Sequence, residues 1–368
     1  MMEPARAPAK PAAESAPQAA AAAAGVPPAQ AAAGHPSHPP ARAEPGAEPG
    51  AADRRHAARP RAPPVAPRLG VVREPSEPGV RAELETDKVA DLRRVLLLCK
   101  QLKAPQALFV FGPAGLAVYA RSHSETAEAC ARVPGEQALR YYAEPGVRLV
   151  VPCEPLSRLV LPCLNGRAVG AITLAVRRGD RDELEVRMRN AGLGLCDTRR
   201  LAAQAAGPSP GDDEAIAGCD PDRFAAAAAA RPLEFVLPGD VFKRCLTDTQ
   251  SADRALVAHQ PGAPLVIEYQ RPGLRNSAAF GDGSQIALRV AERSSVTCCV
   301  ATGDARAVAG AALAPALRCA VAPPADRAGP ADRAGASGDL LILADNPPDH
   351  PVRVCVRIRG IEQLPAYQ

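Results

Sequence analysis

The feature that most constrains this fold is a unit that occurs twice, an amphipathic helix placed directly before a strand-like segment. In the first half, residues 87–103 carry apolar side chains at helical spacing, and the strand-like run "ALFVFG" follows at 107–112. In the second half, the same arrangement is formed by residues 238–249 and the apolar run at 255–258. Helices that alternate with groups of strands predict an α+β fold.

A second helix is predicted in each half, at 154–166 and at 304–318. The first of these is expected to be broken near Pro162, and the second to stop near Pro315, because proline cannot continue a helix interior. The starts of the two helices are 67 residues apart in both halves, from Asp87 to Glu154 and from Leu237 to Asp304. This equal spacing indicates an internal repeat, and a chance coincidence is the alternative.

Strand signals lie between and after these helices. A hairpin is predicted at 107–121 around a Gly-containing turn, and the remaining strands are expected in regions of alternating or continuous apolar residues. These regions are 147–152, 170–190, 264–270, 285–291, 295–301, 317–323, 339–345 and 352–360.

Composition divides the chain into four segments. Residues 1–80 hold 17 of the 40 prolines and almost no periodic apolar pattern, so they are predicted to form a disordered Ala/Pro-rich tail. The two folded domains are predicted at 84–200 and 232–362, and residues 201–231 are expected to connect them.

The sequence contains no constellation of residues for catalysis or metal binding. The eleven cysteines form no CxxC pair, and three of the six histidines lie in the predicted tail. The motifs HExxH, GxSxG, GxxxxGK[ST] and GxGxxG are all missing from the sequence. We therefore predict a protein that is not an enzyme and that uses no metal and no cofactor.

Composition also bears on location and partners. The sequence has no run of 18 apolar residues and no signal-peptide pattern, so we expect an intracellular protein with reduced thiols and no membrane contact. The basic stretch at 54–63 is typical either of a nuclear-import signal or of a solvated patch in a disordered tail. Aromatic residues make up 3% of the chain and tryptophan is missing, which argues against a single-strand binder that stacks bases.

The order and spacing of these segments resemble the sliding-clamp family, which includes proliferating cell nuclear antigen and the processivity factors of large DNA viruses. The stretches that carry the resemblance are "DLRRVLLLCKQL" with "ALFVFGPAGLAVYARS", "EPLSRLVLPCLNGRAVGAITLAVRRGDRDELEVRMRN", "FVLPGDVFKRCLTDTQSADRALVA", and "ALAPALRCAVAP" with "GDLLILADNPPDHPVRVCVRI". The long tail, the alanine-rich connector and a polar insert at 325–338 depart from the family pattern. The resemblance implies a DNA-clamp fold with two similar domains, each with two helices packed on antiparallel sheet.

The resemblance further implies that the helices face duplex DNA and bind it without sequence preference. The expected function is then that of a DNA polymerase processivity factor, which tethers the replicative polymerase and acts in the nucleus. A clamp-fold late transcription factor or a checkpoint-clamp subunit is the alternative, and an enzyme on an unfamiliar scaffold is a third hypothesis. A chain that is rich in Ala, Pro, Arg and Gly and has only five lysines is typical of a GC-rich genome, and together with the resemblance it favours a viral source.

The residues expected to contact DNA are the basic side chains on and beside the four helices. They are Lys88, Arg93, Arg94, Lys100, Lys103, Arg158, Arg167, Lys243, Arg244, Arg254, Arg306 and Arg318. Acidic residues accompany them, so solvated helix faces with no role in binding are the alternative. One chain supplies only half or a third of a ring, so we also expect a homo-oligomer of two or three copies.

Overall fold

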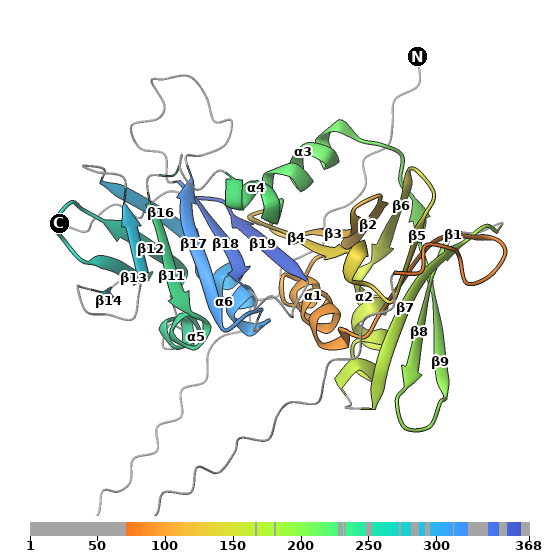
Figure 1. Ribbon diagram of the computed structural model, residues 1–368. Helices are drawn as coiled ribbons and strands as arrows, with labels where there is room; N and C mark the ends of the chain where they lie inside the picture. Colours follow the sequence, from red (N-terminus) through yellow and green to blue (C-terminus); the bar gives the residue numbers. More distant parts are fainter. Residues whose placement is uncertain are drawn as a thin grey trace, which may run out of the picture. The chain divides into compact units, whose positions relative to one another are not determined.

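The computed structural model describes residues 71–165, 168–179, 182–226, 231, 233–247, 252–271, 274–280, 287–290, 295–311, 313–322, 338–345 and 352–361 (Figure 1). Residues 1–70 of the predicted tail lie outside this set, as do Arg167 and all but the last residue of the insert at 325–338. Within the described residues, no helix is both long enough and apolar enough to cross a membrane.

The first half of the fold runs from β1 to β9. Its elements are β1 Val80–Thr86, α1 Val89–Gln101, β2 Gln106–Gly112, β3 Gly115–Arg121, β4 Ala127–Pro134, η1 Gly135–Gln137, β5 Arg140–Ala143, β6 Val147–Pro152, α2 Cys153–Pro155, η2 Leu156–Val160, η3 Cys163–Asn165, β7 Val169–Arg177, β8 Glu183–Asn190 and β9 Cys196–Ala202. The predicted hairpin and the strand at 147–152 are confirmed. The predicted second helix is interrupted beside Pro162, as expected.

The second half runs from β11 to β19 and follows a connecting segment. The connecting segment contains β10 Gln204–Ala205, α3 Pro210–Gly218 and α4 Pro221–Ala226. The second half contains β11 Leu233–Pro238, α5 Gly239–Thr247, β12 Arg254–His259, β13 Leu265–Arg271, β14 Leu274–Phe280, β15 Ala287–Val290, β16 Val296–Ala301, α6 Thr302–Gly310, β17 Ala316–Ala322, β18 Asp339–Asp345 and β19 Arg353–Ile358.

Two predicted elements are corrected. The helix expected at 304–318, with a stop near Pro315, already ends at Gly310, whereas the strand predicted at 317–323 is confirmed as β17, Ala316–Ala322. The connector predicted at 201–231 contains two helices that the sequence analysis did not identify. Their start signal was present, since α3 begins with Pro210 and has Asp212 and Asp213 in its first turn.

Both halves show the same order of described elements: one strand, a helix, five strands, a second helix and three strands. The strands form a five-stranded sheet (β5-β1-β7-β8-β9), a four-stranded sheet (β14-β13-β12-β16) and a ten-stranded sheet (β10-β6-β2-β3-β4-β19-β18-β17-β11-β15). The ten-stranded sheet joins the halves through the antiparallel pairing of β4 with β19, which we call the joint.

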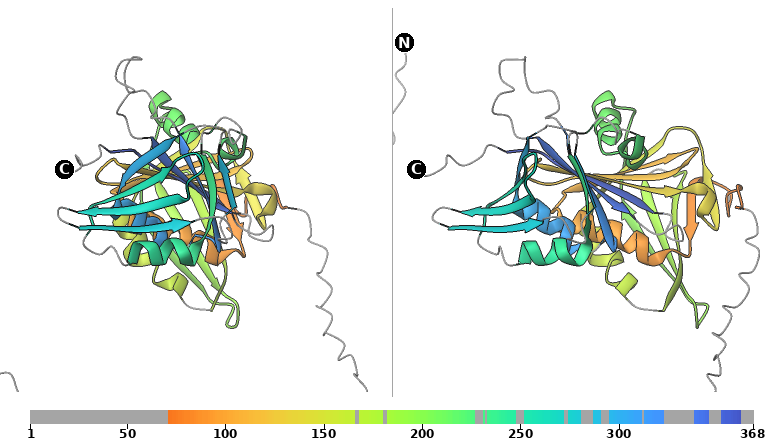
Figure 2. Two further views of the ribbon diagram at one scale, coloured as in Figure 1. Left: turned by 90° about the vertical axis from the view of Figure 1, so that its left-hand side faces the viewer. Right: turned by 60° about the vertical axis from the view of Figure 1, so that its left-hand side comes forward.

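The helices lie on two sides of the ten-stranded sheet. Figure 2 shows α5, α6, α1 and α2 along one side and α3 with α4 on the other. On the first side, α6 contacts both α5 and α1, and these helices share one buried core with both halves. On the second side, α3 covers first-half strands with Ile216 and Cys219, and α4 covers second-half strands with Phe224. The sheet is therefore apolar on both faces near the joint.

Residues 71–79, which we call the strap, belong to the fold although the sequence analysis placed them in the tail. The backbone N–H of Tyr141 donates to the carbonyl oxygen of Val72 at 3.0 Å. The Ser76 hydroxyl donates to the Glu83 carboxylate at 2.7 Å, and Glu77 pairs with Arg177 and Arg187. The folded part therefore begins before the predicted domain boundary at 84, because charges on the outer face of the five-stranded sheet hold a segment that has little apolar pattern.

Acid is expected to release the strap. The hydrogen bond from Arg177 and the charge of Arg187 lower the pKa of Glu77. A carboxyl whose pKa is lower in the folded state contributes stability above its unfolded pKa of about 4.3 and loses it as the pH falls through the folded value. The protection of the Tyr141 amide against hydrogen exchange, measured relative to the intrinsic rate at each pH, should therefore fall below about pH 4. Glu77→Gln should show the lower protection already at pH 7. Unchanged protection in Glu77→Gln would contradict this role of Glu77.

Candidate nucleic-acid interface

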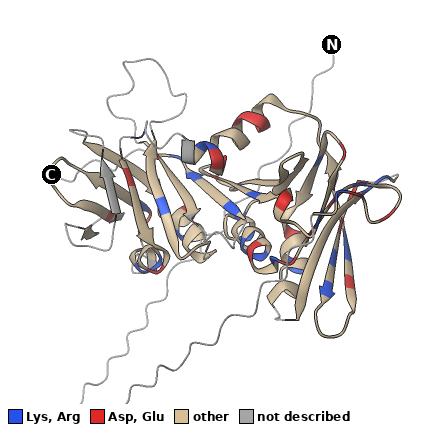
Figure 3. Ribbon diagram, viewed as in Figure 1, with Lys and Arg blue, Asp and Glu red and all other residues tan. Residues whose placement is uncertain are grey.

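Helix α1 has one apolar face and one cationic face. Leu92, Val95 and Cys99 are buried against the sheets, with an i, i+3, i+7 spacing that turns the opposite side of the helix outward. Arg93 and Arg94 on that side are half-buried, and Lys100 is exposed. Figure 3 shows basic residues on α1 and on α5.

Neighbouring polar groups orient the two arginines. The Arg93 Nε donates to the Asn165 Oδ1 at 2.7 Å, and the Arg94 Nη1 lies 3.0 Å from the Asp91 Oδ1. Asp91 is buried, so its carboxylate holds the Arg94 guanidinium group in place and offsets part of its charge. Among the described residues, the Lys100 ammonium group has no hydrogen-bond or ion-pair partner.

Lys103 ends α1 in a conformation that is unusual for lysine. Its φ of 51° lies in the left-handed region, where glycine is the ordinary residue. The Lys103 N–H donates to the Lys100 carbonyl at 3.0 Å, and the Ala104 N–H donates to the Cys99 carbonyl at 3.1 Å. These two bonds form a Schellman cap, which places an exposed ammonium group at the end of the helix.

The variant Lys103→Gly is expected to change stability and DNA binding in opposite directions. Relief of about 1–2 kcal/mol of left-handed strain, partly offset by the greater chain entropy of glycine, should stabilise the fold by about 0.5–1 kcal/mol. Loss of the charge should weaken duplex binding. The matched variant Lys103→Ala keeps the strain and should weaken binding with no gain in stability. Denaturant titrations and binding isotherms measure both, and a destabilised Lys103→Gly would contradict the strain argument.

The second half presents fewer cations on its helices. Lys243 and Arg244 on α5 are exposed, and Arg244 pairs with Asp240 one helical turn away at 3.1 Å. Arg306 on α6 is half-buried and donates to the Ala252 carbonyl at 3.2 Å, so it supports the adjoining loop. Arg254 is half-buried at the start of β12. The cationic character of the helix side is therefore carried mainly by α1 and α5.

The other predicted residues are placed differently. Arg158 is exposed on η2 and pairs with Glu154 at 2.9 Å. Lys88 is half-buried directly before α1, and Arg167 lies outside the described residues. Arg318 was assigned to the fourth helix, and this is wrong: it lies on β17 and pairs with Glu234 at 3.6 Å.

The alternation of side chains along a strand explains where Arg318 lies. It also identifies a basic residue, Arg199, that is not among the predicted DNA-contacting residues. Leu317 and Cys319 face the helix side, so Arg318 between them faces the side that α4 covers. By the same rule, Arg199 shares the core side of β9 with Leu201, next to η2. Alternation along residues 196–202 could have identified Arg199.

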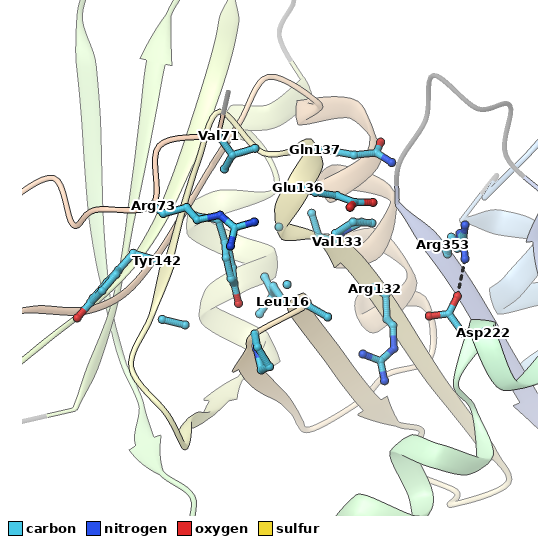
Figure 4. Close-up of a pocket in the computed structure, with 17 residues that line it drawn as sticks. Val71, Arg73, Leu116, Arg132, Val133, Glu136, Gln137, Tyr142, Asp222 and Arg353 are labelled. Carbon is cyan, nitrogen blue, oxygen red and sulfur yellow. Dashed lines mark hydrogen bonds and ion pairs between the residues drawn. The ribbon is translucent and has the colours of Figure 1, made fainter. Parts of the chain in front are cut away.

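Two hollows lie away from the cationic faces of α1 and α5. Figure 4 shows the larger, about 610 Å³ in volume, where Arg73 and Tyr142 line one part and an Arg353–Asp222 ion pair lines another. The smaller, about 390 Å³, includes Ser122 and His123. Among the described residues that line either hollow, no hydroxyl or thiol is hydrogen bonded to a histidine, so neither has the nucleophile–base pair of a hydrolase. Within the described residues there is also no cluster of His, Cys, Asp and Glu arranged to hold a metal ion.

Comparison with known proteins supports the fold. No protein-family model matches the chain, and a search of curated proteins finds no match to its sequence. Among solved structures, the crystal structure of proliferating cellular nuclear antigen from Entamoeba histolytica is similar, with a TM-score of 0.56 and 13% sequence identity. The alignment covers 77% of this chain and 99% of that chain. The chain thus has a sheet-rich fold that resembles the clamp fold of proliferating cell nuclear antigen.

Proposed function

We propose that this protein is a DNA polymerase processivity factor of the sliding-clamp type, with no enzymatic activity of its own. The observation that carries the proposal is the placement of the cationic faces of α1 and α5 on the same side of the ten-stranded sheet. The similar fold of proliferating cellular nuclear antigen supports it. A viral source and a nuclear site of action stay predictions.

The physical basis is binding to phosphates without base readout. Each lysine or arginine that neutralises a phosphate releases condensed counterions, which gives an affinity that depends on salt and not on sequence. Such contacts let a protein slide along a duplex. A polymerase held by the clamp stays at a high effective concentration near the primer end, so it rebinds before it diffuses away.

Duplex binding and primer extension test this function. The full chain should bind duplexes of unrelated sequence with similar affinity, and the logarithm of the binding constant should fall steeply and linearly with the logarithm of the salt concentration. Added to the polymerase from the same source, it should lengthen the products made in a single binding event. Duplex binding without longer products would favour the recruiting scaffold, either a transcription factor or a checkpoint-clamp subunit. A protein that does not bind duplex DNA would overturn both.

The repeat also supports association of several copies. The joint pairs β4, the fourth strand of the first half, with β19, the last strand of the second half. The corresponding strands, β9 and β14, are both edges of their sheets within the described residues. A contact of β9 in one copy with β14 in the next would repeat the joint between copies and would close a ring if the rotation allows it. Light scattering over a dilution series should then show two or three copies, and a monomer at all concentrations would contradict this arrangement.

A further inference from the structure

Arg93 differs from other arginines of the predicted DNA-contacting set in the group that holds it. The Arg93 Nε donates to the Asn165 Oδ1 at 2.7 Å, and this side-chain amide carries no charge. Three other arginines of the set are held by carboxylates: Arg94 by Asp91, Arg158 by Glu154 and Arg244 by Asp240. A carboxylate offsets part of the charge of the arginine that it holds, whereas an amide leaves that charge whole.

The fold brings Asn165 to Arg93 from a distant part of the chain. Asn165 is the last residue of η3, 72 positions after Arg93, and η3 contacts α1. Leu164, directly before it, is 4% exposed and belongs to the core that also contains the buried face of α1. The Asn165 N–H donates to the Pro162 carbonyl at 3.2 Å, which closes the turn. The buried leucine and the turn fix the backbone of Asn165 beside α1, and its exposed side chain binds Arg93.

This hydrogen bond leaves the outer end of the Arg93 guanidinium group available to a ligand. Arginine has five N–H donors, and Asn165 takes the one on Nε. Within the described part of the chain, the Arg93 guanidinium group forms no other hydrogen bond or ion pair. The N–H groups on Nη1 and Nη2 can therefore donate in parallel to two oxygens of one phosphate, which is the strong bidentate arrangement of arginine with this anion.

We propose that Asn165 is a positioning residue for DNA binding, which holds the Arg93 guanidinium group toward a phosphate of the duplex without offsetting its charge. This inference rests on the proposed function. An arginine that is already oriented loses less side-chain entropy on binding, and ordering a free long side chain makes binding about 2- to 12-fold weaker. The amide suits this task, because a carboxylate in its place would compete with the phosphate for the same cation.

Two substitutions of Asn165 in the full chain separate orientation from charge. Asn165→Ala removes the acceptor and keeps the charge of Arg93, so duplex affinity should fall by about 2- to 12-fold while the slope of log affinity against log salt stays the same. Asn165→Asp keeps an acceptor but adds a negative charge beside Arg93, so the slope should flatten by roughly 0.9, as in Arg93→Gln. Unchanged affinity in Asn165→Ala, or an unchanged slope in Asn165→Asp, would overturn the inference.

A double-mutant cycle tests whether Asn165 acts through Arg93. Adding Asn165→Ala to Arg93→Gln should weaken duplex binding no further, because the side chain that Asn165 orients is already gone. An equal loss of affinity in both backgrounds would mean that Asn165 only supports the fold, and would overturn the inference.

Ser157→Ala is the matched control. Ser157 lies on the neighbouring η2, and its hydroxyl donates to the Cys153 carbonyl at 2.7 Å. Its replacement removes a nearby polar side chain that holds no arginine, so duplex affinity should stay the same. A loss equal to that of Asn165→Ala would overturn the inference, because any polar side chain in this region would then have the same effect.

The orientation of Arg93 can also be measured without DNA. Nitrogen relaxation of the Arg93 Nε–H group should show an ordered side chain in the unchanged protein and a mobile one in Asn165→Ala. A mobile Arg93 in both proteins would overturn the inference, while the proposed function still stands on duplex binding. An ordered Arg93 in a protein that does not bind duplex DNA would overturn the proposed function and this role of Asn165 together.

Discussion

Replacing Arg93, Arg94 and Lys100 together by glutamine is expected to weaken duplex binding about equally for every DNA sequence. These three side chains lie on the outward face of α1, and contacts of lysine or arginine with phosphates carry no sequence information. Each phosphate that is no longer neutralised should flatten the dependence of log affinity on log salt by roughly 0.9, so the slope of the triple variant should fall by about 2.7. Processive synthesis should fall while short, distributive synthesis persists, because the polymerase active site is untouched.

A matched triple variant controls for the change in net charge. Arg81→Gln, Arg189→Gln and Arg200→Gln also remove three positive charges, and each of these arginines alternates with a core residue on the outer face of the five-stranded sheet. This control should keep nearly all the salt dependence, whereas Lys243→Gln with Arg244→Gln on α5 should act like the α1 variant. Equal losses of affinity in the α1 variant and the control would show a general charge effect, and no loss in either would mean that the helices do not face DNA.

The substitution Glu128→Gln is expected to destabilise the fold strongly, because this carboxylate on β4 pairs with Arg359, directly after β19, and so links the two halves at the joint. Glu128 on β4 is 1% exposed and lies 3.2 Å from the Arg121 Nη2 and 2.7 Å from the Arg359 Nη2. The free energy of unfolding should fall by about 3 kcal/mol, the lower end for breaking a buried ion pair. The lower end applies because the arginine side chains are 40% and 42% exposed and regain water.

Glu144→Gln is the matched control for Glu128→Gln. Glu144 also pairs with two arginines, Arg81 at 3.5 Å and Arg178 at 2.7 Å, but its side chain is 23% exposed. Its replacement should cost no more than about 1 kcal/mol, as is typical of surface pairs. Denaturant titration of the two variants measures the difference, and equal losses of stability would show that the joint gains nothing from the buried carboxylate.

Local pattern accounts for what could be predicted. The i, i+3, i+4 apolar spacing of α1 and the turn between β2 and β3 depend on residues within a few positions of one another, and both elements were identified. Strand β4 and the strap carry few large apolar residues, and they were missed. Arg318 was misplaced because the predicted helix at 304–318 and the predicted strand at 317–323 overlapped at this residue. The pairing of this run with β11 and β18 decides for the strand.

Neighbouring residues in the chain were enough to establish the repeated helix-then-strands order, the lack of a catalytic motif in the sequence and the basic side of α1. The pairing of β4 with β19 and the orientation of Arg93 by Asn165 became visible only in the folded chain. These contacts join segments from tens to hundreds of residues apart. Such pairings depend on the burial of whole faces and on loop closure, which no local pattern encodes.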